Sequence, residues 1–255
     1  MEHYALPAQV YGAGLVFART GAFAMLIPGI GENGVPPRIR LAFAFVFALT
    51  LYPVVRATLP PVPLNLGGIG AQVGIEVIIG LALGTLLRMF LQTLAVAGEI
   101  VSLQTTLSFA QTTNPLGAVP TTTLATFLTL LGLTLIFATG LHQSFIAGIA
   151  HSYQLFPPGR GVPVGDFGAA MVKTFAQTFA LGVQLAAPVI IFSLIFNVAA
   201  GFIGRAMPQF QIFFVATPLQ VLLGLSIFAL GLGVFGMVWI DSFRSFTDQF
   251  LGRAR

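Results

Sequence analysis

The chain contains no cysteine, and only 7% of its 255 residues are charged. The missing cysteine excludes disulfides, thiol catalysis and cysteine metal sites. Soluble domains carry about 25% charged residues, so the scarcity of charge excludes an ordinary water-soluble protein. No run of lysine and arginine indicates nucleic-acid binding, and no metal-binding, nucleophile or phosphate-binding motif occurs. We therefore expect neither an enzyme nor a protein that holds a cofactor or metal.

The residues that are abundant are apolar. They make up 56% of the chain, and the mean hydropathy is +0.95. A membrane-spanning helix needs about 20 mostly apolar residues, and blocks of this kind lie at residues 8–30, 39–59, 69–97, 124–150, 175–204 and 212–240. The sequence therefore predicts an all-α integral membrane protein with about six hydrophobic helical segments.

The longest interval without charge lies between Glu99 and Arg160 and is 60 residues long. Its second part, from Leu124, reads as ordinary apolar helix. Its first part, residues 104–123, is polar but uncharged and contains two prolines and a glycine; we call it the charge-free segment. A polar, helix-breaking stretch between bilayer-compatible helices indicates backbone that is buried in protein or lines a cavity. The alternative is an ordinary lumenal or periplasmic loop.

Arg19 lies near the middle of the first apolar block, and Glu76 and Arg88 lie inside the third. Charges at membrane depth are costly and usually face protein or water. These charged residues can line a polar pathway through an assembly, or they can pair with other polar groups at a helix–helix interface. The second interpretation is favoured. Glu76 and Arg88 are twelve residues apart, which is about 18 Å along a straight helix, so they cannot pair with each other. Each then needs a partner elsewhere.

Small residues at four-residue spacing, Gly70 with Gly74 and Gly80 with Gly84, predict close approach of helix backbones.

At the other end of the chain, Phe243, Phe246 and Phe250 stand at i, i+3 and i+7. This pattern predicts either an amphipathic helix at an interface or docked on a neighbour, or a simple continuation of the last helix.

The segment Ala97–Ala110 resembles the FliR family of flagellar type III export apparatus proteins, and so do residues 35–42 and 181–218. The resemblance covers essentially the whole chain. Residues 101–106 contain neither the aspartate nor the arginine that the related injectisome family, the SctT family, usually has at this place. This difference favours the flagellar branch.

The resemblance implies a FliP-like N-terminal part, residues 1–172, followed by a FliQ-like helical hairpin, residues 173–255, with its turn at 205–211 and an amphipathic C-terminal tail. It further implies a core subunit of the flagellar protein export gate in the bacterial inner membrane, at the flagellar basal body. The partners so implied are FliP-like, FliQ-like, FlhB-like and FlhA-like proteins, and unfolded flagellar proteins would be the exported substrates.

The resemblance also implies that a loop at about residues 106–122 plugs the gate lumen. Neutral side chains there can satisfy the loop backbone without hydrating the lumen, and prolines and glycine keep the loop from becoming helix. The candidate plug residues are Leu107, Ser108, Phe109, Gln111, Thr112, Asn114, Pro115, Leu116, Gly117 and Pro120. The candidate buried charges for assembly are Arg19, Glu76, Arg88, Glu99 and Arg205.

Two other functions compete with this one. The first is an injectisome export gate subunit. The second is a stand-alone small-solute transporter, whose broken helix would be the proline- and glycine-interrupted region. A transporter would work as a monomer or homo-oligomer with substrate-dependent flux, whereas a gate subunit should be unstable without its FliP-like and FliQ-like partners.

Overall fold

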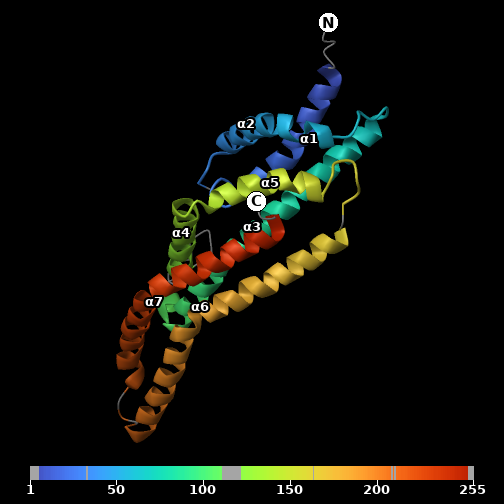
Figure 1. Ribbon diagram of the computed structural model, residues 1–255. Helices are drawn as coiled ribbons and strands as arrows, with labels where there is room; N and C mark the ends of the chain where they lie inside the picture. The colour runs from blue at the N-terminus through green and yellow to red at the C-terminus, as the bar shows by residue number, and fades with distance from the viewer. Residues whose placement is uncertain are drawn as a thin grey trace. The chain divides into compact units, whose positions relative to one another are not determined.

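The computed structural model describes residues 6–32, 34–110, 122–162, 164–207, 209 and 211–251, and all the regular elements in this part of the chain are helices, with no strand (Figure 1). The all-α prediction is confirmed for these residues. The elements are α1 (Leu6–Ala24), α2 (Pro37–Val55), η1 (Arg56–Thr58), α3 (Leu66–Gln104), η2 (Leu107–Ala110), α4 (Thr123–Ala138), α5 (Leu141–Leu155), α6 (Val164–Ala206) and α7 (Ile212–Leu251).

Every predicted apolar block contains a helix, but fewer helices than blocks can cross a bilayer. Among the described residues, four helices are long and apolar enough, namely α2 with η1, α3, α6 and α7. The pair α4 and α5 would add a fifth span if it crosses as one unit. The helix α1, which carries Arg19, is not among them. The model therefore supports four or five spans rather than six.

The block at residues 124–150 is not one ordinary helix, which corrects the prediction. It divides into α4 and α5, whose axes differ by 75°. Gly140 lies at the break with a φ of +74°, and its N–H donates to the carbonyl oxygen of Phe137 at 3.3 Å. Glycine adopts this left-handed conformation without steric cost, so it commonly ends a helix. Gly140 is one of three glycines in this mostly apolar run, so the sequence gave little warning of the break.

Packing divides the chain into two compact units. The first unit is Met1–Phe90, Phe137–Thr174 and Phe243–Arg255, and the second is Leu91–Ile136 and Phe175–Ser242. This division by packing differs from the predicted division of the sequence into a FliP-like part, residues 1–172, and a FliQ-like part, residues 173–255. The predicted division rests on similarity to FliP-like and FliQ-like proteins. Packing does not test that similarity, so the division stays a prediction.

In the first unit, α1 and α3 approach closely at glycines. A Cβ added at Gly80 would lie 2.3 Å from the carbonyl oxygen of Arg19, and one added at Gly84 would lie 2.8 Å from the Cβ of Leu26. The predicted close approach is thus confirmed for this pair of glycines. No part of this chain approaches Gly70 or Gly74, where nothing lies within 4 Å of an added Cβ, so close approach at these two glycines stays a prediction.

The C-terminal turns of α7 also belong to the first unit. Phe243 and Phe246 are buried, and their ring centroids lie 5.2 and 4.6 Å from that of Phe90. Phe243 also meets Phe145 edge-on at 5.8 Å. Since α7 runs unbroken to Leu251, the tail is a continuation of the last helix. Phe243 and Phe246 of its phenylalanine face dock on the same chain, while the side chain of Phe250 lies outside the described residues.

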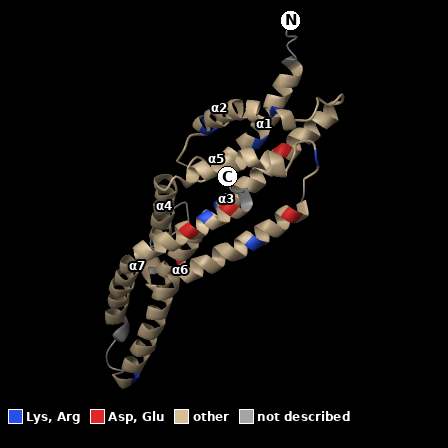
Figure 2. Cartoon of the chain, in the orientation of Figure 1, with Lys and Arg blue, Asp and Glu red and all other residues tan. Residues whose placement is uncertain are grey.

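The second unit is almost free of charge. Figure 2 shows the sparse charges of the chain, of which this unit holds only Glu99, Arg205 and Asp241. Parts of α6 and α7 form a hairpin here, with the connection between Ala206 and Ile212 where the turn is expected (Figure 1). In the most apolar stretch of each of these helices only 22% of residues are buried, against 50% in α3. The hairpin therefore leaves most of its apolar surface open.

Candidate functional site: the frame of the charge-free segment

The second unit fixes both ends of the charge-free segment, while its middle, residues 111–121, lies outside the described residues. Seven of the predicted plug residues therefore have no described position, namely Gln111, Thr112, Asn114, Pro115, Leu116, Gly117 and Pro120. Leu107 and Ser108 are half-buried, and together with the backbone of Phe109 they belong to the short helix η2. The candidate site is thus the frame around the segment.

The upstream end is anchored at Gln104, the last residue of α3. Its main-chain carbonyl oxygen accepts a hydrogen bond from Nε2 of Gln220 at 2.8 Å. Its side-chain Oε1 accepts a hydrogen bond from Oγ of Ser193 at 2.6 Å. Ser193 is on α6 and Gln220 on α7, and both side chains are buried. A single residue thereby ties the end of α3 to both arms of the hairpin.

The backbone turns immediately after this anchor. Thr105 is fully buried, and its Oγ1 donates to the carbonyl oxygen of Val101 at 2.8 Å. Thr106 has a φ of +59°, the only positive φ of a described non-glycine residue. A β-branched residue in this left-handed region costs on the order of 1–3 kcal/mol. The turn ends α3 in the manner of a left-handed helix cap, with threonine where glycine is usual.

Gly224 of α7 makes room for this turn. A Cβ added there would lie 2.5 Å from Cγ2 of Thr105. Because a side chain at that position would push α7 away from Thr105, the upstream anchor depends on close packing as well as on hydrogen bonds.

The downstream end is fixed at Thr122, which precedes α4. Its Oγ1 accepts a hydrogen bond from the N–H of Ala125 at 3.2 Å, which caps the helix. Its own N–H donates to Oε1 of Glu99 at 2.8 Å. Glu99 lies on α3, five residues before the end of that helix, and its side chain is half-buried. A carboxylate at this place also interacts favourably with the positive end of the α4 helix dipole.

Gly98 sets the distance between the two helices at this end. A Cβ added there would lie 2.4 Å from Cα of Ala125 and 2.7 Å from its backbone nitrogen. The backbones of α3 and α4 therefore touch beside Glu99, and any larger residue must separate them. The Gly98–Glu99 pair, part of the sequence resemblance, thus has a structural role that spacing alone did not indicate.

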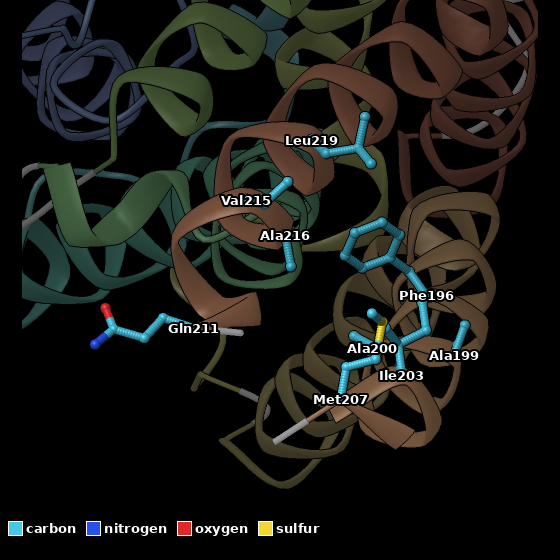
Figure 3. A pocket seen from close by; sticks show the side chains of 9 residues that line it. All are labelled: Phe196, Ala199, Ala200, Ile203, Met207, Gln211, Val215, Ala216 and Leu219. Carbon is cyan, nitrogen blue, oxygen red and sulfur yellow. The ribbon is translucent and has the colours of Figure 1, made fainter. Parts of the chain in front are cut away.

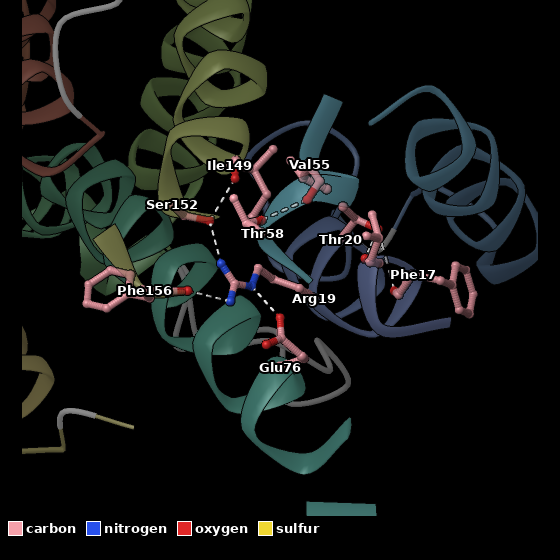
Figure 4. Close-up of polar contacts among 10 residues, drawn as sticks. Phe17, Arg19, Thr20, Val55, Thr58, Glu76, Ile149, Ser152 and Phe156 are labelled. Atoms are coloured by element: carbon pink, nitrogen blue, oxygen red, sulfur yellow. Dashed lines mark hydrogen bonds and ion pairs between the residues drawn. The ribbon is translucent and has the colours of Figure 1, made fainter. Parts of the chain in front are cut away.

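The five charged residues that were predicted to be buried and to act in assembly lie in different surroundings. In the first unit, Arg19 and Glu76 are buried and paired with each other, with Nε of Arg19 2.6 Å from Oε2 of Glu76 (Figure 4). Nη1 of Arg19 donates to Oγ of Ser152 at 3.1 Å, and Nη2 donates to the carbonyl oxygen of Phe156 at 2.8 Å. The guanidinium carbon also lies 4.0 Å from the ring centroid of Tyr153.

This cluster joins α1, α3, α5 and the residue that follows α5. The cluster therefore holds these helices of the first unit together, which agrees with the interpretation that the charges pair where helices meet. Neither Arg19 nor Glu76 needs a partner on another chain. The partner of Glu76 is Arg19, which sequence spacing could not identify because the two residues are 57 positions apart.

The remaining three charges differ from the prediction of burial. Arg88 and Glu99 are half-buried, and Arg205 is exposed in the chain by itself. Arg205 lies in the last turn of α6, where a cation is favourable next to the negative end of the helix dipole. Its burial would require contact with another molecule, so the assembly role stays a prediction.

The open face of the hairpin contains an apolar groove of about 410 Å³ (Figure 3). Its walls come from α6 and α7 and include Phe196, Ala199, Ile203, Val215, Ala216 and Leu219. The groove offers apolar contact and almost no polar group. Among the described residues, no group of three or more histidine, aspartate or glutamate side chains could hold a metal ion.

The arrangement defines an all-helical membrane protein with a framed, uncharged segment. Residues 10–246 match the family model described as bacterial export proteins, family 1. The chain is 57% identical over 250 residues to the flagellar biosynthetic protein FliR of Caulobacter vibrioides, covering 98% of this chain and 100% of that relative. It is 30% identical to FliR of Aquifex aeolicus over 243 residues, covering 92% and 91% of the two chains.

A further relative, FliR of Escherichia coli, is 30% identical over 212 residues, which cover 83% of this chain and 80% of the relative. The chain therefore belongs to the FliR family of bacterial export proteins. It is a component of the flagellar export apparatus, and its relatives carry the names of flagellar biosynthesis proteins rather than of enzymes.

Proposed function

We propose that this chain is a core subunit of the flagellar protein export gate in the bacterial inner membrane. With FliP-like and FliQ-like subunits it would form the channel for unfolded flagellar proteins, and the charge-free segment would plug the closed channel. The observation that carries the proposal is the frame around this segment. Four side chains, those of Glu99, Gln104, Ser193 and Gln220, fix its two ends in a unit that otherwise contains almost no charge.

The uncharged character of the segment supports the role of a plug. A charged side chain in a closed lumen would attract water and hold oppositely charged parts of a passing polypeptide. Neutral threonine, serine, glutamine and asparagine side chains can satisfy the backbone of the segment without either effect. The anchors at Gln104 and Thr122 fix where the segment begins and ends, so movement of the residues between them need not disturb the supporting helices.

The open apolar surface of the hairpin supports assembly with other subunits. Phe202, Phe214 and Leu230 are 68, 72 and 88% exposed, and the groove of Figure 3 lies on the same hairpin. A FliQ-like hairpin built from residues 173–255 would pack with neighbouring FliP-like and FliQ-like helices. FlhB-like and FlhA-like proteins would complete the apparatus at the basal body.

Deletion of residues 109–119 tests the plug. We expect the export complex to assemble with its partner subunits, and the resting membrane to become permeable to ions and small solutes. The readouts are co-purification of the partners and solute entry into resting cells. A deletion variant that assembles normally and leaves the membrane tight would show that the segment is not the plug.

A separate experiment addresses the gate against the transporter. We expect the chain to be unstable when expressed alone and stable when co-expressed with its FliP-like and FliQ-like partners. A purified single chain that carries a small solute by itself would overturn the gate proposal.

A further inference from the structure

The downstream end of the charge-free segment is capped by residues from two different helices. In the usual capping box, the Ser or Thr before a helix accepts the N–H three residues later, and a Glu or Gln at that later position accepts the N–H of the first residue. Thr122 makes the first of these bonds with Ala125. Ala125 has no acceptor in its side chain, and Glu99 of α3 makes the second bond instead.

The role of Glu99 is therefore not that of an ordinary ion-pair residue. The second unit contains one cation, Arg205, and within the described residues no ion pair is formed by Glu99. Its carboxylate faces the first N–H groups of α4, where negative charge is favourable. Contact between the backbones at Gly98 and Ala125 holds the carboxylate at this place.

The two anchors of the segment differ in their exposure to water. Upstream, two buried neutral side chains, Ser193 and Gln220, hold Gln104. Downstream, the contact from α3 to the residue that ends the segment is one hydrogen bond from a half-buried carboxylate. Water can compete for a half-buried carboxylate more readily than for buried groups. The downstream anchor is therefore the one that can open without unpacking the helices.

We propose that Glu99 is a positioning residue that clamps the downstream end of the charge-free segment to α3. When the bond between Glu99 and Thr122 is intact, the first residue before α4 is held against α3, so α4 begins at a fixed position beside α3. When it opens, Thr122 is released from α3. The clamp is a local structural device, and only its effect on sealing depends on the proposed plug function.

The absence of native cysteine allows a direct test in the complete export complex, purified with its partner subunits. Thr122→Cys places the only thiol of this chain at a position that is 6% exposed. The rate of its reaction with a maleimide then reports release of the downstream end. The test variants are Glu99→Ala, which removes the acceptor, and Glu99→Gln, which keeps an acceptor oxygen without the charge. The control is Gln92→Ala, because Gln92 is an exposed polar residue two turns earlier on α3.

Glu99→Ala is expected to accelerate labelling by about tenfold or more, because a hydrogen bond to a charged group is lost. Glu99→Gln should give an intermediate rate, and Gln92→Ala should leave the rate unchanged. Equal labelling rates with Glu99 and with Ala at this position would overturn the clamp, as would an equally large effect of Gln92→Ala.

Solute entry into resting cells with the same variants separates the clamp from the plug. Faster labelling together with a leak supports both. Faster labelling in an assembled complex that stays tight supports the clamp and counts against the plug. Unchanged labelling overturns the clamp, and the deletion of residues 109–119 then still decides the plug.

Discussion

Glu76 and Glu99 lie on the same helix, α3, in unlike surroundings. Glu76 belongs to the first unit, where its side chain is 1% exposed and forms an ion pair with Arg19. Glu99 belongs to the second unit, where it is half-buried and accepts a backbone N–H from the end of the charge-free segment. One carboxylate therefore completes a buried cluster among helices, and the other holds the residue that precedes α4.

The difference shows why charge inside an apolar helix has no single meaning. A fully buried charge without a partner is too costly to persist, so Glu76 must stay paired for the fold to form. A half-buried carboxylate keeps access to water, so the bond of Glu99 can open at modest cost. The account therefore assigns Glu76 to stability and Glu99 to the position of the segment.

The largest effect is expected for breaking the Arg19–Glu76 pair. Removing either partner, by Arg19→Met or Glu76→Leu, should destabilise the chain by about 3–5 kcal/mol, because the other charge stays buried and uncompensated. Thermal unfolding of the purified complex and the amount of chain that accumulates are the measurements. Arg38→Met is the control, because Arg38 is exposed.

The double variant Arg19→Met with Glu76→Leu sharpens this comparison. It should be less damaging than either single change, because no charge is left buried. If the losses in stability of the two single variants simply add in the double variant, the two residues act independently. The ion pair between Arg19 and Glu76 would then not be the reason for their burial.

A smaller effect is expected for Gly98→Ala. The added methyl meets the backbone of Ala125, so α3 and α4 must separate, at a cost of about 1–3 kcal/mol. The same helix offers a matched control in Gly70→Ala, because nothing lies within 4 Å of a Cβ added at Gly70. Thermal unfolding of the two variants is the measurement. If Gly98→Ala is as stable as Gly70→Ala, the contact at the downstream anchor is looser than described.

The upstream anchor is tested by Gln220→Ala. The carbonyl oxygen of Gln104 would lose its buried donor, and we expect a loss of about 1–2 kcal/mol in stability. Ser226→Ala on the same helix is the control, because Ser226 is exposed and its hydroxyl donates only to a carbonyl of its own helix. Similar unfolding temperatures for the two variants would show that Gln220 contributes nothing to the anchor.

The smallest effect, and the only gain, is expected for Thr106→Gly. Glycine adopts a φ of +59° without steric cost, so the change relieves strain and is expected to stabilise the turn by about 0.5–1 kcal/mol. The measurement is again the unfolding temperature of the complex. A lower temperature would mean that the side chain of Thr106 contributes more to packing than its backbone costs.

The sequence predicted the fold class and the hairpin turn well, because apolar blocks and their proline and glycine separators are local signals. It did not predict the break at Gly140, because nothing in the sequence sets this glycine apart from Gly132 and Gly148 in the same mostly apolar run. It marked residues 104–123 as unusual from the absence of charge alone. The charge-free segment was therefore located by the charged residues that the sequence lacks there.

The contacts that frame the segment could not be predicted in the same way. Ser193 and Gln220 lie 89 and 116 positions from Gln104, and only the packing of three helices brings them together. Glu99 was placed among charges for assembly because it stands next to the charge-free segment. Its bond to Thr122 depends on the α3–α4 contact at Gly98, which no local pattern reveals.

The central claim is that Glu99 positions the charge-free segment whereas Glu76 maintains the fold. The most direct test is the ion conductance of the reconstituted export complex, measured per assembled complex for Glu99→Ala and for Glu76→Gln. We predict that Glu99→Ala raises the conductance of each complex with little loss in assembly. Glu76→Gln should reduce the amount of complex and leave the conductance of the remaining complexes unchanged. Equal conductance per complex in the two variants, together with labelling of Thr122→Cys that Glu99→Ala does not accelerate, would contradict the account.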